Sequence, residues 1–310
     1  MRGVLNIAKP TGITSYDVIR RLKAVLRPAP RAIGHAGTLD PMASGVLLVL
    51  LGEATKVSSL LLGRPKTYAA TVVFGRATDT DDATGRTVRE SAVPAVDRAG
   101  LDAALDRFRG TFEQVPPAFS AIKQDGRPLY ERARRGEAVT VKPRTVTVYE
   151  LALTDWTAPR AELNLTVSAG TYIRSIARDI GESLGSAATL ERLERTRIGK
   201  FALDAAVALE DLTDESARRA LIPVEDALDW LPRVEVDPDA ARDLALGRRI
   251  TLPAVRHSEF DIHNSPVLCL SSDRRFLALA RVVADKLQPD RIIYNDEQAT
   301  SAARLSIADR

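Results

Sequence analysis

The sequence predicts an α+β protein: a mixed, largely antiparallel sheet flanked by helices, followed by a smaller C-terminal unit of distinct composition. Three observations predict this fold. Apolar and polar residues alternate with the strand period of two at residues 68–74 and 161–169, and residues 146–153 give a further strand signal. Helical spacing also occurs, but not in regular alternation with strands, which disfavours a doubly wound parallel sheet. The composition changes after residue 231, and the prolines that bound residues 232–238 predict a linker.

The first predicted helix begins after Thr14. Residues 14–17, Thr-Ser-Tyr-Asp, read as a capping box, in which two side chains satisfy backbone N–H groups of the first turn. Pro28 and Pro30 end the helix, because proline cannot continue it. The apolar residues on its buried side are Val18, Leu22, Val25 and Leu26.

The later elements follow from the same periods. The strand at residues 68–74 closes at Gly75, and residues 101–108 have helical spacing. Another helix is predicted just after the strand that ends near residue 169. Its apolar side, formed by Ile173, Ile176, Ile180 and Leu184, leaves Tyr172 and Arg174 at the helix entrance rather than on the core stripe.

Composition limits the class of protein. A hydrophobic content of 45% supports a substantial core, and the apolar run at residues 46–51 is far shorter than the roughly 20 residues that a membrane span needs. No signal peptide is expected at the N-terminal end, and the lone Cys269 excludes an internal disulfide framework. With only three histidines, a Cys/His metal site is not expected either. We therefore expect a cytoplasmic protein with no membrane or metal partner.

Charged residues are segregated along the chain, although the net charge is only +3. Residues 18–39 contain five cations and no acid, and residues 121–145 contain seven cations and three acids. Residues 203–230 instead contain eight carboxylates and two arginines. Such segregation suits a phosphate-binding face on an otherwise soluble body, while solvated helix faces would give the same pattern without any partner.

A glycine-rich loop at residues 34–46 holds the strongest candidate for chemistry. It contains one carboxylate, Asp40, one imidazole, His35, and three glycines that let the backbone turn or approach a ligand. Pro41 disfavours helical geometry at Asp40, so we expect this carboxylate in an irregular loop. Taken alone, an Asp-Pro turn more often has a carboxylate that caps nearby backbone N–H groups.

This loop resembles the Gly-His-x-Gly-x-Leu-Asp-Pro motif around the catalytic aspartate of the bacterial tRNA pseudouridine-55 synthases. Other segments resemble further motifs of that family in the same order, and together they cover roughly residues 3–230. They are residues 9–15, 68–75, 78–85, 115–123, 170–179 and 190–201. We interpret Asp-Thr-Asp-Asp at residues 79–82 as a polar turn of that family, because the run fails the pattern of a calcium loop.

The resemblance implies a pseudouridine synthase fold and the isomerisation of uridine 55 in the T loop of tRNA. That reaction detaches uracil from C1′ of its ribose, turns it and rejoins it through C5, so we expect no cofactor. The resemblance assigns the required carboxylate to Asp40, and covalent attack, base catalysis and electrostatic assistance all stay open. It also implies Arg174 as the charge partner of Asp40, and Tyr172 as a residue near the base, involved in taking the proton from C5.

The resemblance further implies a pocket for a base flipped out of its stack. It assigns base stacking to Tyr68, an apolar wall to Leu193, and a bracing or space-filling role against the RNA to His35. Lys9 either steadies the catalytic loop or contacts RNA. Without the resemblance, the tyrosines would be read as half-buried residues of a sheet edge, His35 as a loop histidine bonded to backbone, and Arg174 as a surface cation.

The predicted partner is tRNA, held through its T arm. A basic insertion at about residues 115–144 resembles the loop that grips RNA in bacterial members of the family. Its predicted contacts with the RNA backbone are Lys123, Arg132, Arg134, Arg135 and Lys142. The chain departs from the family's Leu-Arg-Arg motif, because it reads Leu193-Glu194-Arg195, so no role is carried over to the first arginine of that motif.

Two domains are predicted, a catalytic domain at residues 1–231 and an RNA-binding domain at residues 232–310. The second domain resembles a PUA domain, a small β-barrel module that binds RNA, at residues 245–250, 276–280 and 287–289. Nothing in the sequence requires a protein partner or an assembly larger than a monomer.

Two other functions stay open. One is that of the guide-RNA-dependent relative in archaeal and eukaryotic ribonucleoproteins, which shares the catalytic core. The basic insertion and the Met-Ala-Ser sequence after Pro41 favour the bacterial enzyme instead. The other is a tRNA-binding or tRNA-folding protein without catalysis, against which the joint presence of Asp40, Tyr68, Tyr172 and Arg174 speaks.

The basic insertion yields a testable prediction. Replacing Arg132, Arg134 and Arg135 together with alanine should weaken tRNA binding, and each lost phosphate contact should reduce the slope of log affinity against log salt by about 1. Filter binding at a series of salt concentrations measures both quantities. Unchanged affinity in the triple variant would contradict the predicted grip.

Overall fold

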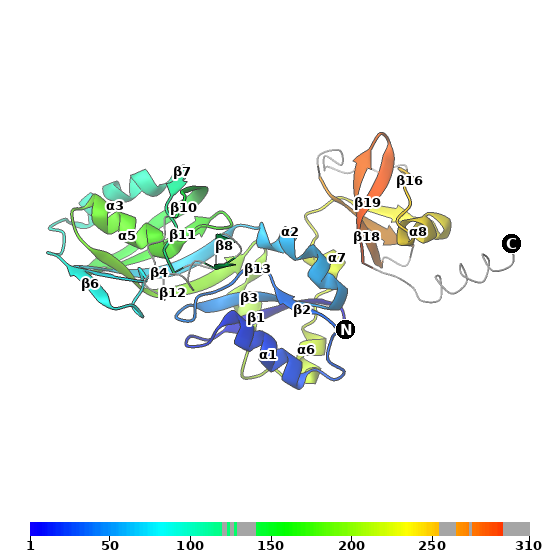
Figure 1. Ribbon diagram of the computed structural model, residues 1–310, viewed down its shortest axis with the longest axis horizontal. Helices are drawn as coiled ribbons and strands as arrows, with labels where there is room; N and C mark the ends of the chain where they lie inside the picture. Colours follow the sequence, from blue (N-terminus) through cyan, green and yellow to red (C-terminus); the bar gives the residue numbers. More distant parts are fainter. Residues whose placement is uncertain (120–122, 125–126, 129–140, 254–264, 273–274, 294–310) are drawn as a thin grey trace.

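The computed structural model describes the chain except for residues 120–122, 125–126, 129–140, 254–264, 273–274 and 294–310. Two sheets dominate the described part (Figure 1). The larger sheet draws its strands from residues 3–208 and the smaller one from residues 233–292. Helices flank both sheets, so the predicted α+β class is confirmed.

The large sheet has ten strands and is mixed but mainly antiparallel, as predicted. Its main path runs β14-β1-β3-β12-β4-β11-β10-β7, with β2 added to β3 and β13 added to β12. Among its described pairs, β1 with β14 and β3 with β12 are parallel. The strands are β1 Gly3–Lys9, β2 Ile33–His35, β3 Ser44–Leu51, β4 Lys66–Phe74, β7 Gly110–Gln114, β10 Arg144–Thr157, β11 Arg160–Val167, β12 Ala188–Ile198, β13 Phe201–Ala202 and β14 Val207–Ala208.

The helices are short, and among the described residues no helix is both long and apolar enough to cross a membrane. The α-helices are α1 Ser15–Val25, α2 Ser58–Leu62, α3 Arg98–Leu105, α5 Ile173–Ser183, α6 Asp214–Arg219, α7 Val224–Ala227 and α8 Pro238–Ala245. The 3-10 helices are η1 Gly52–Val57, η2 Asp106–Phe108 and η3 Leu203–Ala205. Two small ribbons complete this part, β5 Arg76–Thr78 with β6 Thr87–Glu90, and β8 Lys123–Gln124 with β9 Arg127–Pro128.

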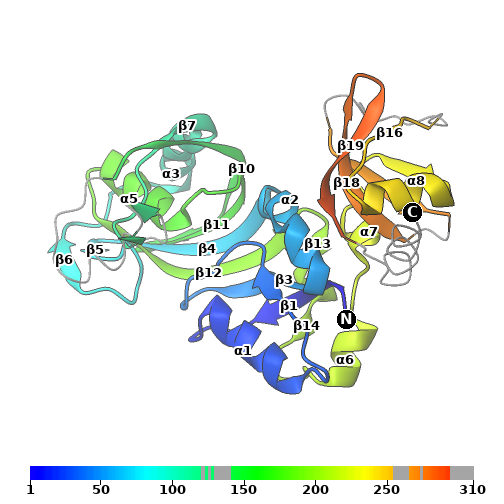
Figure 2. The same ribbon diagram turned by 45° about the vertical axis from the view of Figure 1, so that its right-hand side comes forward.

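Helices cover the two halves of the large sheet separately (Figure 2). α3 and α5 pack on β4, β10, β11 and β12 around one apolar cluster. α1 packs on β1 and β3 around another. The predicted capping box of α1 is present, because the N–H of Asp17 donates to Thr14 Oγ1 at 3.1 Å and the N–H of Thr14 donates to Asp17 Oδ2 at 2.8 Å. Local capping and apolar burial therefore agree in fixing α1 against the strands that flank the candidate loop.

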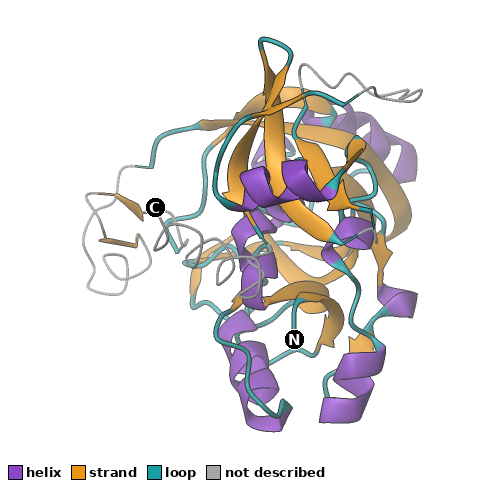
Figure 3. Ribbon diagram, turned by 90° about the vertical axis from the view of Figure 1, so that its right-hand side faces the viewer, coloured by secondary structure: helices purple, strands orange, loops and turns teal. Residues whose placement is uncertain are grey.

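The C-terminal sheet is a curled sheet of five strands in the order β15-β17-β18-β19-β16, with α8 against it (Figure 3). Its strands are β15 Arg233–Val236, β16 Ile250–Thr251, β17 Val267–Ser271, β18 Phe276–Val283 and β19 Lys286–Ile292. The predicted linker at residues 232–238 is wrong, because β15 occupies it and pairs in parallel with β17. The prolines lie at the element boundaries: Pro232 precedes β15, and Pro238 is the first residue of α8, where proline is well tolerated.

A short parallel joint connects the two halves of the large sheet. Between β3 and β12 the register contains two pairs, Ser44 with Glu194 and Gly45 with Arg195. The Ser44 hydroxyl also donates to the Glu194 carboxylate at 3.2 Å, so the residue that departs from the family motif has a partner at this joint. Gly45 has φ of +106°, and a Cβ there would lie 2.2 Å from the carbonyl oxygen of Arg195. Only glycine permits such a close approach of the two backbones.

Gly45 yields a prediction about stability. Gly45→Ala should lower the free energy of unfolding by at least about 3 kcal/mol, because an alanine there is strained in φ and also collides with the neighbouring strand. Gly185→Ala is the matched control, since Gly185 has φ of +67° and nothing within 4 Å of its would-be Cβ. The control should lose about 1 kcal/mol from φ strain alone. Urea unfolding of both variants measures the two free energies. If both variants lost the same amount, β3 and β12 could move apart at this joint without cost, and the prediction would be wrong.

Candidate active site

The loop that carries Asp40 connects β2 to β3 and is held by residues from the first motif. The hydroxyl of Ser15, at the start of α1, accepts from the N–H of Leu39 at 2.9 Å and lies 3.2 Å from its carbonyl oxygen. The N–H of Gly12 donates to the carbonyl of Pro41 at 2.7 Å. The residues on both sides of Asp40 are therefore tied to the same neighbouring segment, which fixes where its side chain leaves the loop.

Arg195 holds the loop from the opposite side, a role that the sequence did not reveal. It lies on β12 with 1% of its surface exposed. Its guanidinium donates to the backbone carbonyls of Val46 at 2.7 Å, Gly37 at 2.9 Å and Thr38 at 3.3 Å. A buried arginine bonded to three carbonyls is costly to move, because each lost bond would leave a polar group unsatisfied. The only signal in the sequence was the position of Arg195 within a partly matching motif.

Asp40 and Arg174 form the central ion pair. Arg174 Nε lies 2.9 Å from Asp40 Oδ2, and Arg174 Nη2 donates to Asp40 Oδ1 at 3.3 Å. The side chain of Arg174 is 5% exposed, whereas that of Asp40 is 34% exposed. The guanidinium thus holds the carboxylate from inside the protein, with one hydrogen bond from Nη2 and a charge contact at Nε that lacks hydrogen-bond geometry, while the carboxylate remains open to a ligand.

Arg174 is itself held by the polar turn at residues 79–82 and by the start of the insertion. Its Nη1 donates to the carbonyl of Thr80 at 2.8 Å and lies 3.6 Å from the buried carboxylate of Asp82. Its Nη2 also donates to the carbonyl of Phe119 at 3.1 Å. Sequence reasoning missed Asp82, because it assigned this run only a turn. The turn does exist, and it also supplies a second acid that Arg174 neutralises.

Tyr68 and Leu193 lie in one apolar cluster beside the loop. Both are 7% exposed, and the cluster also contains Leu39 and Ala43 from the loop itself. Tyr68 is on β4 and Leu193 on β12, which pair directly along this part of the sheet. The sheet therefore brings these two predicted residues to the same side of the loop that carries Asp40.

Tyr172 lies immediately before α5, as predicted, and is half-buried. Its backbone forms two bonds with the side chain of Gln114, because its N–H donates to Gln114 Oε1 at 2.9 Å and its carbonyl accepts from Gln114 Nε2 at 3.0 Å. Arg174 was predicted at the same helix entrance, and it is the second residue of α5. It is fully enclosed, however, rather than at the surface.

His35, the last residue of β2, is half-buried, and Lys9, the last residue of β1, is buried. Burial, together with the nearby charge of Arg195, lowers the pKa of the half-buried His35. Lys9 is 1% exposed, and its ammonium donates to the carbonyls of Pro10 and Ile13, each at 2.8 Å. Burial lowers the pKa of Lys9 to about 8, partly offset by the charge of Asp40. This geometry supports a role for Lys9 in steadying the loop more than a contact with RNA.

Most of the predicted contacts with the RNA backbone cannot be located on the fold. Arg132, Arg134 and Arg135 lie outside the described residues, and of Lys123 only the strand β8 is described. Lys142, just before β10, is exposed. Among the residues that the structure describes, no group of three His, Cys, Asp or Glu side chains could hold a metal ion.

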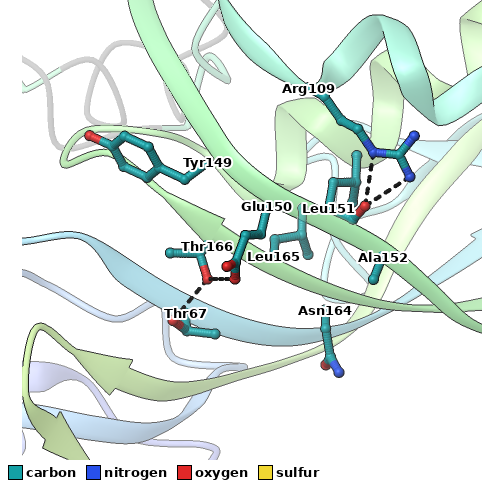
Figure 4. Close-up of a pocket in the computed structure, with 9 residues that line it drawn as sticks. All are labelled: Thr67, Arg109, Tyr149, Glu150, Leu151, Ala152, Asn164, Leu165 and Thr166. Atoms are coloured by element: carbon teal, nitrogen blue, oxygen red, sulfur yellow. Dashed lines mark hydrogen bonds between the residues drawn. The ribbon is translucent and has the colours of Figure 1, made fainter.

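A hollow of about 440 Å³ lies elsewhere on the large sheet (Figure 4). It is lined by Thr67, Arg109, Tyr149, Glu150, Leu151, Ala152, Asn164, Leu165 and Thr166. None of these is a predicted site residue. Thr67 precedes Tyr68 on β4, so their side chains point to opposite faces of the sheet. The Thr166 hydroxyl donates to the Glu150 carboxylate at 3.0 Å and accepts from the Thr67 hydroxyl at 3.1 Å, so these three polar side chains are bonded to one another. We therefore assign the chemistry to the side of Asp40.

Comparison with known proteins supports this choice. The model of "TruB family pseudouridylate synthase (N terminal domain)" matches residues 23–173, and that of "tRNA pseudouridylate synthase B C-terminal domain" matches residues 174–229. A tRNA pseudouridine synthase B of Xanthomonas campestris pv. campestris (strain 8004) is 39% identical over 311 residues, with 97% of each chain covered. That of Gloeobacter violaceus is 42% identical over 295 residues, covering 93% of this chain and 98% of the relative.

Solved structures agree with the fold over nearly the whole chain. A chain in a structure of an H/ACA RNP bound to a substrate RNA containing 2′-deoxyuridine has a TM-score of 0.72 at 25% identity, covering 95% of this chain and 86% of that one. A chain in a Cbf5-Nop10-Gar1 complex has a TM-score of 0.73 at 26% identity, covering 96% and 86%.

Two buried lysines around the loop predict how stability depends on pH. Like Lys9, Lys66 donates to backbone carbonyls, those of Leu62 at 2.6 Å and Arg64 at 2.7 Å. Burial lowers the pKa of both lysines from 10.5 to about 8. Between these two values the unfolded chain binds more protons than the folded one, so the free energy of unfolding should rise with pH across that window. Below about pH 8 both states are protonated and this rise disappears.

Urea unfolding at a series of pH values tests this, with a Lys9→Met/Lys66→Met double variant beside the wild type. The double variant should lack the rise, whereas Lys142→Met, at an exposed position, should keep it. Parallel pH profiles for the wild type and the double variant would refute the lowered pKa values.

Proposed function

The chain belongs to the TruB family of tRNA pseudouridine synthases, and from that premise we propose that it converts uridine 55 in the T loop of tRNA to pseudouridine, with Asp40 as the catalytic carboxylate. The enzyme is an isomerase. One observation carries the assignment of the site. The carboxylate of Asp40 is one third exposed and is held from within by a buried guanidinium.

The ion pair explains how a charged acid can face an apolar base. A carboxylate beside the apolar cluster of Tyr68 and Leu193 needs a compensating charge, because burial without a partner disfavours the ionised form. Arg174 supplies that charge. Its Nη1 atom, which faces away from Asp40, lies beside the second carboxylate, that of Asp82. The proposed site therefore presents Asp40 as a carboxylate of fixed orientation.

In the proposed reaction the bond between C1′ and N1 of uridine breaks, with its electron pair going to N1. Asp40 acts at the positive charge that develops on C1′, by covalent attack or by base or electrostatic assistance. The freed base turns until C5 faces C1′, and the new C1′–C5 bond forms; in the covalent alternative the bond between C1′ and Asp40 breaks at this step and returns its electron pair to the carboxylate. C5 then loses its proton and N1 gains one, so no atom enters or leaves and no cofactor is required.

The remaining predicted residues take supporting roles in this proposal. Tyr68 stacks on the flipped base and Leu193 forms the apolar wall, which their shared cluster beside the loop supports. Tyr172 lies near C5 and assists its deprotonation. His35, whose pKa burial lowers, braces the RNA as a neutral side chain rather than as a cation.

We further propose that tRNA binds across the insertion at residues 115–144 and the first helix. Arg20, Arg21, Lys23 and Arg27 are all exposed on or just after α1. The curled C-terminal sheet acts as a PUA-like RNA contact in this proposal. We also propose that the enzyme works in the cytoplasm and as a monomer.

One observation favours a second function, dependence on a guide RNA. The similar chains of known structure include one from an H/ACA RNP and one from a Cbf5-Nop10-Gar1 complex. The curated relatives, which are more similar in sequence, are named tRNA pseudouridine synthase B, and this favours direct action on tRNA. Incubating the purified chain with a tRNA transcript and no guide RNA decides between them.

Asp40→Asn tests the proposed chemistry. The amide keeps the size of the side chain but removes the negative charge, so pseudouridine formation should fall by at least about 1,000-fold while tRNA still binds. Mapping pseudouridine in an unmodified transcript measures the rate, and filter binding measures affinity. Asp106→Asn is the matched control, because this carboxylate is 71% exposed and pairs with Arg109, away from the candidate site. Product formation at the wild-type rate by Asp40→Asn would rule out Asp40 as the essential group.

A further inference from the structure

Gln114 is a buried amide that no step of the reaction uses. It is the last residue of β7 and is 1% exposed. Its side chain donates to the carbonyl of Tyr172 at 3.0 Å and accepts from the N–H of the same residue at 2.9 Å. Both backbone groups of Tyr172 are thus bonded to one side chain.

Two hydrogen bonds to the backbone of one residue fix its orientation as well as its distance from Gln114. A side-chain amide offers an uncharged N–H donor and an uncharged carbonyl acceptor side by side on one planar group, which suits it to bond the N–H and the carbonyl of one residue. Tyr172 is also the residue before α5 and has no side-chain cap there. Gln114 bonds both backbone groups of this N-cap residue, so it sets the direction in which the chain enters the helix that carries Arg174.

The position of Gln114 links this entrance to the insertion. Gln114 pairs with Arg144 of β10, so the insertion leaves and re-enters the sheet at this pair. The carbonyl of the next residue, Val115, accepts from Ser175 Oγ at 2.9 Å and from Arg178 Nη2 at 3.0 Å. The first residues of the insertion are therefore bonded to the first two turns of α5.

We propose that Gln114 is a positioning residue. It holds Tyr172 and the first turn of α5 at the distance and orientation from Asp40 that the reaction needs. This inference rests on the proposed function and deepens it. Gln114 sets the geometry for the bound uridine without contacting it. The amide also joins the root of the insertion to the backbone of Tyr172, two residues before Arg174. An RNA held by the insertion is thereby held in a fixed relation to the carboxylate.

Gln114→Met tests the proposal, because methionine keeps the length and apolar bulk but removes both hydrogen bonds. The single-turnover rate of pseudouridine formation at saturating tRNA should fall by about 10–100-fold, as expected for a small misplacement of a catalytic group. The dissociation constant for tRNA should change by less than about two-fold, since no RNA contact is lost. Glu113→Met is the matched control: Glu113 precedes Gln114 on β7, is exposed, and points to the other face.

Hydrogen exchange provides a direct readout of the clamp. Amide exchange in residues 170–176 should accelerate in Gln114→Met and not in Glu113→Met. Gln114→Glu, which keeps the acceptor for the Tyr172 N–H but loses the donor, should show the same slower rate and unchanged affinity if the methionine variant does not fold. An unchanged rate, a loss confined to tRNA affinity, or an equal loss in Glu113→Met would overturn the proposal. Absence of pseudouridine in the wild-type reaction would refute the proposed function instead, and the exchange data would still decide whether Gln114 holds Tyr172.

Discussion

The need to satisfy one buried guanidinium organises this site. Arg174 lies almost out of water; its Nη1 and Nη2 atoms donate hydrogen bonds, and its Nε lies 2.9 Å from Asp40 Oδ2, held by charge rather than by a hydrogen bond. Its acceptors come from three distant segments: the loop at Asp40, the turn at residues 80–82 and the start of the insertion at Phe119. Satisfying a single side chain thus fixes the mutual positions of all three. Asp40 is oriented as a consequence of that constraint.

Around the loop, cations are held by main-chain carbonyls rather than by carboxylates. This holds for Arg195, Lys9 and Lys66, which are bonded to backbone oxygens of the loop or of its neighbours. A carbonyl has no charge to lose, so these bonds keep their acceptors at a pH where carboxylates would be protonated. These cations therefore act on Asp40 only through their charge at a distance. The cation in direct contact with its carboxylate is Arg174.

Local patterns predicted much of the fold and part of the site. The capping box at Thr14, the alternation in β4 and the glycine-rich loop are local signals, and each gave a correct element. Asp82 and Arg195 were not predicted as parts of the site, because their roles arise from contacts in the interior with segments more than 90 residues away. The linker at residues 232–238 was misread for a related reason, since prolines mark the ends of elements as readily as they mark a linker.

The short joint between β3 and β12 has a mechanical consequence. Asp40 belongs to the half of the large sheet that contains β1, β2 and β3, and Arg174 belongs to the half covered by α5. Strands joined over two residue pairs resist bending less than strands joined along their full length. The Asp40–Arg174 ion pair and the hydrogen bonds from Arg195 to the loop therefore add side-chain ties where the two backbones share only two residue pairs. The residues that shape the candidate site also hold the two halves of the sheet together.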